Sequence, residues 1–373
     1  MEESESEETV HILTTLGEHL IDSILRDEPI DAIKRVVAEG APLWYQNSEG
    51  LSALHAAAYA QDIDLVHFLI AEGAIWNAVD NMKNTAGDIA LSFGNEEIYT
   101  AVRNAGIRAE MLLAVLSPVS EPEEPSSEFM VIRSEDDTAA GSTDAFLASK
   151  LKFVKDENGQ EICVVKAGDD EIGVMMAWET GIMEETVKAL CEAHPKAEGL
   201  KVLNIGFGLG IIDTLFQSLP NPPATHIIVE PHPDVLQRMK EHGWYQKPGV
   251  KILECKWQDS IEELLAVGGF DVIYTDTFSE DYHALRGFFE HLPDLLAGPE
   301  SRFSFFNGLG ATNLLFYDVY SHLAELHLSD VGVDVQWKDV NLSNERDVDR
   351  WGKTREYFRM PLYRLPVGSM ARF

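Results

Sequence analysis

Between residues 201 and 308 the chain alternates short apolar runs with stretches of helical period, and this alternation restricts the fold more than any other feature of the sequence. Five of the runs have the length and composition of strands: KVLNIGF, HIIVE, KILEC, FDVIYTD and RFSFFNG. Strands that alternate with helices are typical of an open sheet with parallel strands. We therefore expect an α/β domain, which the later segments VDVQWKDV and REYFRMPLYRLPVG complete as an antiparallel edge.

The N-terminal part of the chain repeats itself. DAIKRVVAEGAP, which begins at Asp31, returns as DLVHFLIAEGAI from Asp64, and SALHAA from Ser52 returns as TAGDIA from Thr85. A period of about 33 residues with this kind of helix start is the ankyrin signature. Because single repeats cannot bury their apolar faces, we expect helical turns before Asp31 and after Asn95 to cap the pair.

A segment rich in Pro, Ser, Glu and Gly separates the repeats from the α/β region. It contains SPVSEPEEPSSE and RSEDDTAAGSTDA, a composition that buries too little apolar area to order itself. We therefore expect ankyrin-like repeats with helical caps over residues 1–115, a flexible acidic linker over residues 116–145, and one α/β domain over residues 146–373.

The net charge of −34 limits the direct partners of this chain. Nucleic acid is disfavoured because phosphates require clustered Lys and Arg, whereas a basic protein would be attracted. No apolar run approaches the roughly 18 to 20 residues of a membrane span, and the start MEESESEE is unlike a signal peptide, so we expect a cytoplasmic or nuclear protein. The three cysteines lack the spacing of a disulfide framework or a zinc site.

The first strand of the α/β domain runs into a glycine-rich turn, NIGFGLGIID. Gly206, Gly208 and Gly210, with Phe207 between them, let a ligand approach the backbone where a helix begins, so we expect a nucleotide-like ligand. A dinucleotide fingerprint would require Gly or Ala at position 211, which is Ile211. The spacing therefore favours S-adenosylmethionine.

The next two strands supply further candidates for this ligand site. HIIVE ends in Glu230, about 20 residues after the last glycine, where a carboxylate can accept from both ribose hydroxyls. After KILEC, Trp257 offers a stacking plane for adenine, and Asp259 can accept from the adenine amine. Asp259 suits the N-cap of the helix SIEELL equally well.

Two other carboxylates are notable for their surroundings. Asp276 follows the strand FDVIYTD, at the end where open α/β sheets hold their ligands, although it also suits a turn-forming cap. Glu179 lies inside the apolar run GVMMAWETGIM. An unpaired buried charge costs several kcal/mol, so Glu179 is expected to be exposed, paired or used in chemistry.

Taken together, these segments resemble one family. VMMAWETGIM, VLNIGFGLGI, HIIVEPHPDVLQRMK, WQD, FDVIYTDTFSED and FFNGLG are similar to guanidinoacetate N-methyltransferase, and more closely to its fungal relatives, the type IV protein arginine methyltransferases. Those relatives also carry ankyrin-like repeats before the catalytic domain. The resemblance implies a Rossmann-like, S-adenosylmethionine-dependent methyltransferase domain over residues 146–373. It also implies S-adenosylhomocysteine as the product, and methylation of the internal δ-nitrogen of an arginine in a protein, with a ribosomal protein as the suggested substrate.

The resemblance further implies roles for single residues. The family's active-site glutamate falls on Glu179, and its catalytic aspartate falls on Asp276, which also borders the cofactor. Further cofactor contacts are expected at Met176, Met183, Gly206, Phe207, Gly208, Gly210, Glu230, Trp257, Gln258 and Asp259. Two positions depart from common patterns: Asn204 stands where many methyltransferases carry an acid, and Gln258 replaces the acid of a W-E-D motif. No metal is expected, since a sulfonium is already an activated methyl donor.

The residues suggest a mechanism for methylating a guanidinium, which is a poor nucleophile because its lone pairs are delocalised. Two carboxylates would fix its planar fork and leave one nitrogen freer to attack, and Asp276 would take a proton. Phe278, Tyr282 and Trp178 are candidates for excluding water or for core packing, Asn307 for a polar lining, and His283 for a proton shuttle or a surface residue.

Other functions remain open. One is methylation of a small guanidino compound such as guanidinoacetate, a second is an ankyrin scaffold with an inactive methyltransferase fold, and a third is a nicotinamide-dependent dehydrogenase. The acidity and the repeats favour a basic protein substrate over a small one. The repeats themselves fit either a surface for a protein partner or a cap docked on the next domain.

Overall fold

The computed structural model of the chain describes residues 2–116, 138–155, 159–168, 170–192, 194–196, 198–342, 351 and 354–371, with side chains from residue 9 onward. The chain divides into two compact units. One consists of Met1–Pro118 with Gly310–Leu323, and the other of Val119–Leu309 with Ala324–Phe373.

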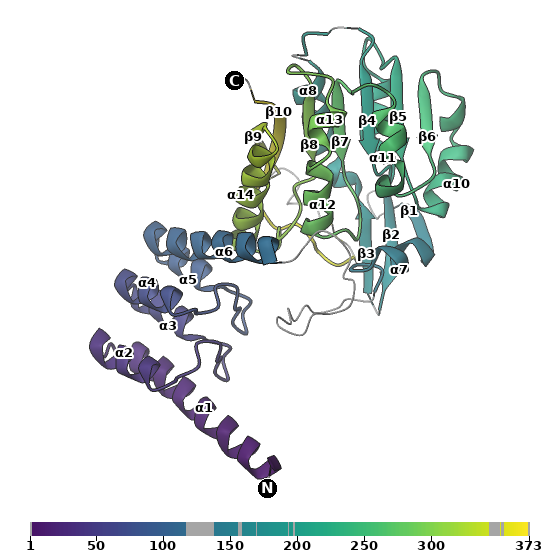
Figure 1. Cartoon of the computed structure of the whole chain (residues 1–373). Coiled ribbons are helices and arrows are strands. Elements are labelled where there is room, and N and C mark those ends of the chain that lie inside the picture. The colour runs from purple at the N-terminus through teal and green to yellow at the C-terminus, as the bar shows by residue number, and fades with distance from the viewer. Residues whose placement is uncertain are drawn as a thin grey trace. The chain divides into compact units, whose positions relative to one another are not determined.

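The first unit contains the helical repeats that the period predicts. Its helices are α1 (Glu2–Leu25), α2 (Ile30–Ala38), α3 (Ala53–Ala60), α4 (Ile63–Ala71), α5 (Ala86–Ser92) and α6 (Glu96–Leu116) (Figure 1). Equivalent caps begin α3 and α5, because the hydroxyls of Ser52 and Thr85 accept from the backbone three residues later. Gly40 and Gly73 follow α2 and α4 at φ +99° and +94°, the conformation that favours glycine after a helix.

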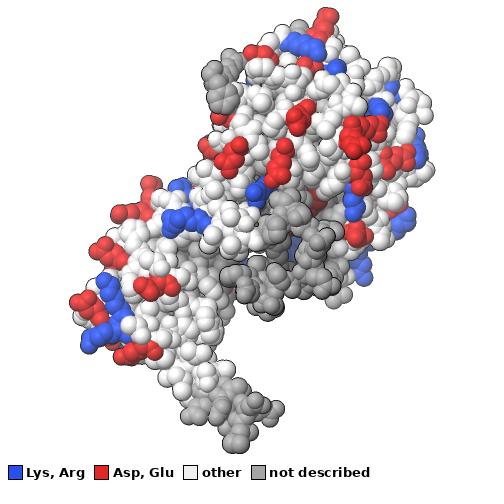
Figure 2. Space-filling view, in the orientation of Figure 1, with Lys and Arg blue, Asp and Glu red and all other residues white. Residues whose placement is uncertain are grey.

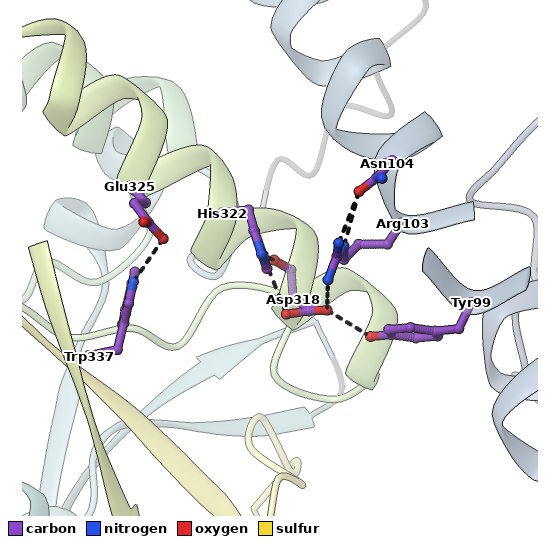
Figure 3. Close-up of polar contacts among 7 residues, drawn as sticks. All are labelled: Tyr99, Arg103, Asn104, Asp318, His322, Glu325 and Trp337. Atoms are coloured by element: carbon purple, nitrogen blue, oxygen red, sulfur yellow. Dashed lines mark hydrogen bonds and ion pairs between the residues drawn. The ribbon is translucent and has the colours of Figure 1, made fainter. Parts of the chain in front are cut away.

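A segment from late in the sequence also belongs to the first unit. It contains the first half of α14 (Leu314–Asp330), where Oδ2 of Asp318 accepts from the Tyr99 hydroxyl at 3.1 Å and lies 3.5 Å from Nη1 of Arg103 (Figure 3). Tyr99 and Asp318 are 219 positions apart. The predicted domain boundary at residue 115 does not include this segment, because no local pattern shows such a distant pairing.

The second unit is built on the predicted α/β sheet. Its seven strands lie in the order β6-β5-β4-β7-β8-β10-β9, and the five from β6 to β8 are parallel. These five match the five apolar runs: β4 (Lys201–Ile205), β5 (Thr225–Val229), β6 (Val250–Leu253), β7 (Val272–Thr275) and β8 (Arg302–Phe305). The order places the ends of β4, β5 and β7 side by side, where ligands of such sheets bind.

The predicted antiparallel pair forms at the end of the sheet, but its two strands do not follow β8 in chain order. β9 (Val333–Asn341) is the outer strand, and β10 (Leu362–Met370) inserts between β8 and β9. The segment REYFRM is not part of a strand, since β10 begins at Leu362. Pro366 therefore lies within an interior strand, whereas a proline in such a segment favours an edge or a strand end.

Helices cover both faces of this sheet. Val202 packs with residues of α8 (Thr180–Cys191) and α9 (Ile211–Gln217) on one face. The next residue, Leu203, packs on the other face with α11 (Trp257–Leu265), α12 (Tyr282–Phe289) and α13 (Leu292–Leu295). This alternation along β4 is the period of a strand that is buried on both sides. On the first side α10 (Pro233–Glu241) and the 3-10 helix η2 (Trp244–Gln246) complete the layer.

A second, smaller sheet was not predicted from the sequence. It consists of β1 (Leu151–Lys155), β2 (Glu161–Ala167) and β3 (Asp170–Met175), and β3 leads into the 3-10 helix η1 (Ala177–Glu179). Helix α7 (Thr143–Ala148) precedes it.

Most of the predicted linker lies outside the described residues, but its end is folded, because Ser142 caps α7 and Phe146 is buried. Acidic side chains are spread over the visible face of the molecule and do not gather in one patch (Figure 2).

Candidate active site

A cavity opens at the carboxyl ends of β4, β5 and β7, within the second unit. It has a volume of about 680 Å³, counting its open mouth, and we call it the first cavity. Its lining includes Thr143, Phe146, Leu147, Val174, Met175, Gly206, Gly208, Glu230, Lys256, Trp257, Gln258, Asp276, Phe278 and Glu280. Six of the predicted cofactor residues are thus brought together, as the order of the strands requires: Gly206, Gly208, Glu230, Trp257, Gln258 and Asp276.

The glycine turn has no room for side chains. Gly206 has φ +89°, and a Cβ there would lie 2.0 Å from the carbonyl oxygen of Asp276. Gly210 has φ +73°, and its Cβ would lie 2.2 Å from the Phe207 ring. Gly206 thus lets the turn lie against the end of β7, whereas Gly210 and the buried Phe207 serve packing beneath the turn and are not among the cavity lining.

Glu230 joins the end of β5 to the glycine turn. Its Oε2 accepts from the N–H of Phe207 at 2.9 Å, and its Oε1 accepts from the N–H of His232 at 2.7 Å. Burial raises the pKa of Glu230 to about 7, although these hydrogen bonds act in the opposite direction. The carboxylate predicted to bind ribose therefore also holds the turn in place.

Of the three residues after β6 that are predicted to contact the cofactor, two line the first cavity and one does not. Trp257 and Gln258 line the first cavity, and both donate to the carboxylate of Glu280, at 3.0 Å and 2.9 Å. Asp259 is exposed and is absent from the cavity lining. Helix α11 begins at Trp257 with Lys256 as its N-cap, so the prediction of Asp259 as the N-cap was wrong.

The predicted methionines lie behind the cavity wall. Met183 is fully buried and its sulfur accepts from the Tyr274 hydroxyl at 3.3 Å, and Met176 is buried beneath Gly173. Met175 lines the cavity instead, with its sulfur 3.2 Å from the backbone nitrogen of Leu209. The sequence run VMMAW does not indicate which methionine faces inward, because the strand ends within it.

A second cavity adjoins the first and contains both predicted catalytic carboxylates. It has a volume of about 940 Å³, counting its open mouth, and Val174, Asp276, Thr277, Phe278 and Glu280 line both cavities. The remaining lining is Ile172, Gly173, Glu179, Thr275, Ser279, Asp281, Leu285, Phe306, Gly308, Leu309 and Tyr357. A ligand of each cavity would meet the other at this shared wall.

Glu179 is buried, with 3% of its surface exposed, at the end of η1. Its carboxylate turns back to accept from the N–H of Met176 at 2.8 Å and also accepts from the Tyr357 hydroxyl. Burial, and secondarily repulsion from Asp276, raises the pKa of Glu179. Burial likewise raises the pKa of Asp276. A cation between the two would favour the ionised form of both.

The other candidates from the sequence are distributed differently. Phe278 lines both cavities and also packs on Phe146, with ring centroids 4.7 Å apart. The rest are not among the lining residues: Trp178 packs on Phe358, the Tyr282 hydroxyl lies 2.8 Å from Nδ1 of His327, and Asn307 donates to the carbonyl of Arg364. His283 is likewise absent from both linings.

Several lining residues were missed by sequence reasoning. Tyr357 comes from the segment before β10, and Thr143, Phe146 and Leu147 come from α7, which spans the predicted boundary between the linker and the α/β domain. The only available signal was the apolar pair Phe146 and Leu147 after a capping serine.

Within the described residues, no group of His, Cys, Asp and Glu could hold a metal ion, and no helix is long and apolar enough to cross a membrane.

Comparisons with known proteins agree with this architecture. The family model for guanidinoacetate N-methyltransferase matches residues 168–308, and that for ankyrin repeats (3 copies) matches residues 20–110. The protein named protein arginine N-methyltransferase 2 from Cryptococcus neoformans var. neoformans serotype D (strain B-3501A) is 41% identical over 379 residues, which cover 96% of each chain. Proteins of the same name from Aspergillus oryzae and Saccharomyces cerevisiae are 38% and 35% identical, and cover 81% and 82% of this chain and 76% and 77% of their own. The ankyrin match extends into both predicted caps: it covers most of α6 but only the last residues of α1.

Proposed function

The chain belongs to the protein arginine N-methyltransferase 2 family, and we propose that it transfers a methyl group from S-adenosylmethionine to the internal δ-nitrogen of an arginine in a basic protein. The observation that supports this best is the pair of carboxylates in the second cavity. Glu179 and Asp276 come from different elements and line one cavity, and burial raises the pKa of both carboxyl groups, so each would be stabilised in its ionised form by a cationic ligand. A guanidinium supplies that charge together with a planar fork of N–H donors.

The first cavity fits the proposed methyl donor. Gly206 leaves the backbone open where a Cβ would collide with Asp276, and the Glu230 carboxylate lies in the lining where ribose hydroxyls can donate to it. Trp257 and Met175 provide apolar surface in the same lining. When bound here, S-adenosylmethionine would supply a methyl group already activated on a sulfonium.

The residues of the second cavity would prepare the acceptor. Glu179 and Asp276 would accept hydrogen bonds from the guanidinium, fix its plane, and concentrate its positive charge away from the attacking nitrogen. Asp276 belongs to the wall that the two cavities share, so it would take the proton that the attacking nitrogen loses. Phe278 would exclude water from the same wall. Such alignment of two reactants can contribute about 7 to 11 kcal/mol.

The choice of substrate follows from charge. With a net charge of −34, the protein would attract a basic polypeptide, and we propose a ribosomal protein as its target. The ankyrin repeats would offer a surface for a protein partner. We further propose that the protein acts in the cytoplasm and nucleus, where such substrates are made and assembled.

Methylation assays would test the proposal directly. The probe is the acid-extracted protein fraction of fungal cells that lack the corresponding activity, incubated with this protein and labelled S-adenosylmethionine. We expect label in protein, and fragmentation of the methylated arginine in a mass spectrometer should place the methyl group on the internal nitrogen. Label on a terminal nitrogen would refute the proposed position, and no label in protein would refute the proposed substrate class.

A second candidate is methylation of a small guanidino compound, which the match to guanidinoacetate N-methyltransferase over residues 168–308 favours. The same assay with guanidinoacetate in place of protein separates the two. Rapid label transfer to guanidinoacetate, with none to the protein fraction, would replace the first proposal with this one.

A further inference from the structure

Tyr357 reaches the second cavity from a segment outside any strand or helix. The segment is held beside the small sheet, because the N–H of Arg355 donates to the carbonyl of Glu171 at 3.0 Å. The Tyr357 ring packs on Trp178 and Trp351, with centroids 5.7 Å and 4.7 Å away. These contacts fix the ring, and they place its hydroxyl at the carboxylate of Glu179.

Both hydrogen bonds that the described residues make to the Glu179 carboxylate are accepted by the same oxygen. Oε1 accepts from the Tyr357 hydroxyl and from the N–H of Met176, whereas Oε2 accepts from neither. A carboxylate with one oxygen held from two directions cannot rotate freely, and its second oxygen keeps its acceptor capacity for a ligand. This asymmetry suits a side chain that must present one oxygen to a guanidinium.

We propose that Tyr357 is a positioning residue of the methyl transfer: its hydroxyl holds Oε1 of Glu179 so that Oε2 faces the guanidinium of the substrate. The inference rests on the proposed function, and it adds a residue from the C-terminal segment to the two carboxylates. Tyr357 acts through Glu179, so its loss should alter how well the acceptor is aligned and leave binding of the methyl donor unchanged.

The same hydrogen bond favours the ionised form of Glu179. Burial and Asp276 raise the pKa of Glu179, while the Tyr357 hydroxyl and the Met176 N–H lower it. Other titratable groups near Glu179 are Tyr274, whose own pKa is raised by burial and by both carboxylates, and Glu280 and Asp281, which line the same cavity. Without the Tyr357 hydroxyl, the pKa of Glu179 should rise further, and a larger share of the enzyme would be protonated and unable to hold a cation at a given pH.

The test compares Y357F with a matched control. Y357F keeps the ring that packs on the two tryptophans and removes only the hydroxyl. Y245F removes the same group from an exposed hydrogen bond of 2.6 Å between Tyr245 and Glu254. Initial rates are measured with the acid-extracted protein fraction at limiting concentration and saturating S-adenosylmethionine, over a range of pH. The dissociation constant of S-adenosylhomocysteine is measured by calorimetry.

For Y357F we expect a rate about tenfold lower, as loss of one hydrogen bond to a charged group predicts, and an acidic limb of the pH–rate profile shifted to higher pH. Cofactor affinity should be that of the wild type, and Y245F should match the wild type throughout. A Y357F protein with the rate and pH profile of Y245F would overturn the proposal. So would a weakened affinity for S-adenosylhomocysteine, since that would indicate a general loss of structure.

E179Q separates this inference from the function on which it rests. If E179Q retains the wild-type rate, the carboxylate clamp itself is wrong. If E179Q is impaired and Y357F is not, only the role of Tyr357 is wrong. In the double variant, removing the hydroxyl should cost less than it does in the wild type, because its partner is already altered. A purely structural tyrosine would give the same loss in both backgrounds, even if Y357F were less stable.

Discussion

Asn204 and Asp213 form a buried hydrogen bond beneath the glycine turn, with Nδ2 of Asn204 2.8 Å from Oδ2 of Asp213. The same Nδ2 donates to the carbonyl oxygen of Gly206 at 2.8 Å, and Oδ1 of Asp213 lies 3.0 Å from Nε2 of His226. An amide donor at position 204 therefore joins the turn to an acid that is supplied from α9. This accounts for an asparagine where many methyltransferases carry an acid.

Asn204→Asp should destabilise the protein. The change removes the donor shared by Gly206 and Asp213 and places two carboxylates together in the core, which should cost about 3 kcal/mol or more. Chemical denaturation of the variant measures this cost. N77D makes the same change at an exposed position of the first unit and should be close to neutral. Equal stability of N204D and the wild type would show that the network beneath the turn contributes little.

Asp276→Asn should reduce turnover by at least about 100-fold, as loss of a positioned general base commonly does, with little effect on cofactor affinity. The asparagine retains the size of the side chain in the shared wall but cannot take a proton. Turnover is measured by label transfer to the protein fraction, and affinity by calorimetry with S-adenosylhomocysteine. D294N, at an exposed position of α13, provides the control. Near wild-type turnover in D276N would exclude Asp276 as the base.

The sequence predicted the parts of the site that follow from local pattern and strand order. The five parallel strands were visible as apolar runs, and the ends of three of them carry Gly206, Glu230 and Asp276. The carboxyl ends of parallel strands share one edge of the sheet, so these residues had to lie close together. No side-chain geometry was needed for that step.

The rest depends on packing between segments that are distant in the sequence. Tyr357 reaches Glu179 across 178 positions, and no period or motif indicates that pairing. Met175 lines the first cavity, whereas the predicted Met176 and Met183 are buried behind its wall, because β3 ends at Met175 and η1 changes the direction of the chain after it. Asp259 is turned to solvent because α11 begins two residues before it. Each of these outcomes is decided by where an element starts, which sequence patterns define least well.

Glu230→Gln should weaken the binding of S-adenosylhomocysteine about tenfold or more, and it should also lower the melting temperature. The carboxylate accepts from two backbone N–H groups, on Oε1 and Oε2, and an amide can replace only one of those acceptors while presenting N–H to the other donor. Calorimetry and thermal unfolding measure the two effects separately. E241Q, on the exposed end of α10, should change neither. A lower melting temperature with an unchanged dissociation constant would leave Glu230 a role in the turn and none at the ribose.

The raised pKa of Glu179 predicts how its replacement affects stability as pH changes. A carboxyl group whose pKa is higher in the folded than in the unfolded state binds protons more tightly when folded, so its contribution to stability is present at low pH and is lost as pH rises through the folded pKa. Glu179→Gln has no carboxyl group to ionise, so the variant does not lose this stability as pH rises. The difference in melting temperature, E179Q minus wild type, should therefore increase between about pH 5 and about pH 8. Each kcal/mol that ionisation of Glu179 costs the folded wild type should add about 2 °C or more to this difference. Thermal unfolding without ligand over this range is the measurement, and E185Q, whose carboxylate pairs with Lys338 and has a lowered pKa, should show no such gain. If the difference in melting temperature between E179Q and the wild type does not change with pH, then ionisation of Glu179 does not destabilise the folded protein and its pKa is not raised.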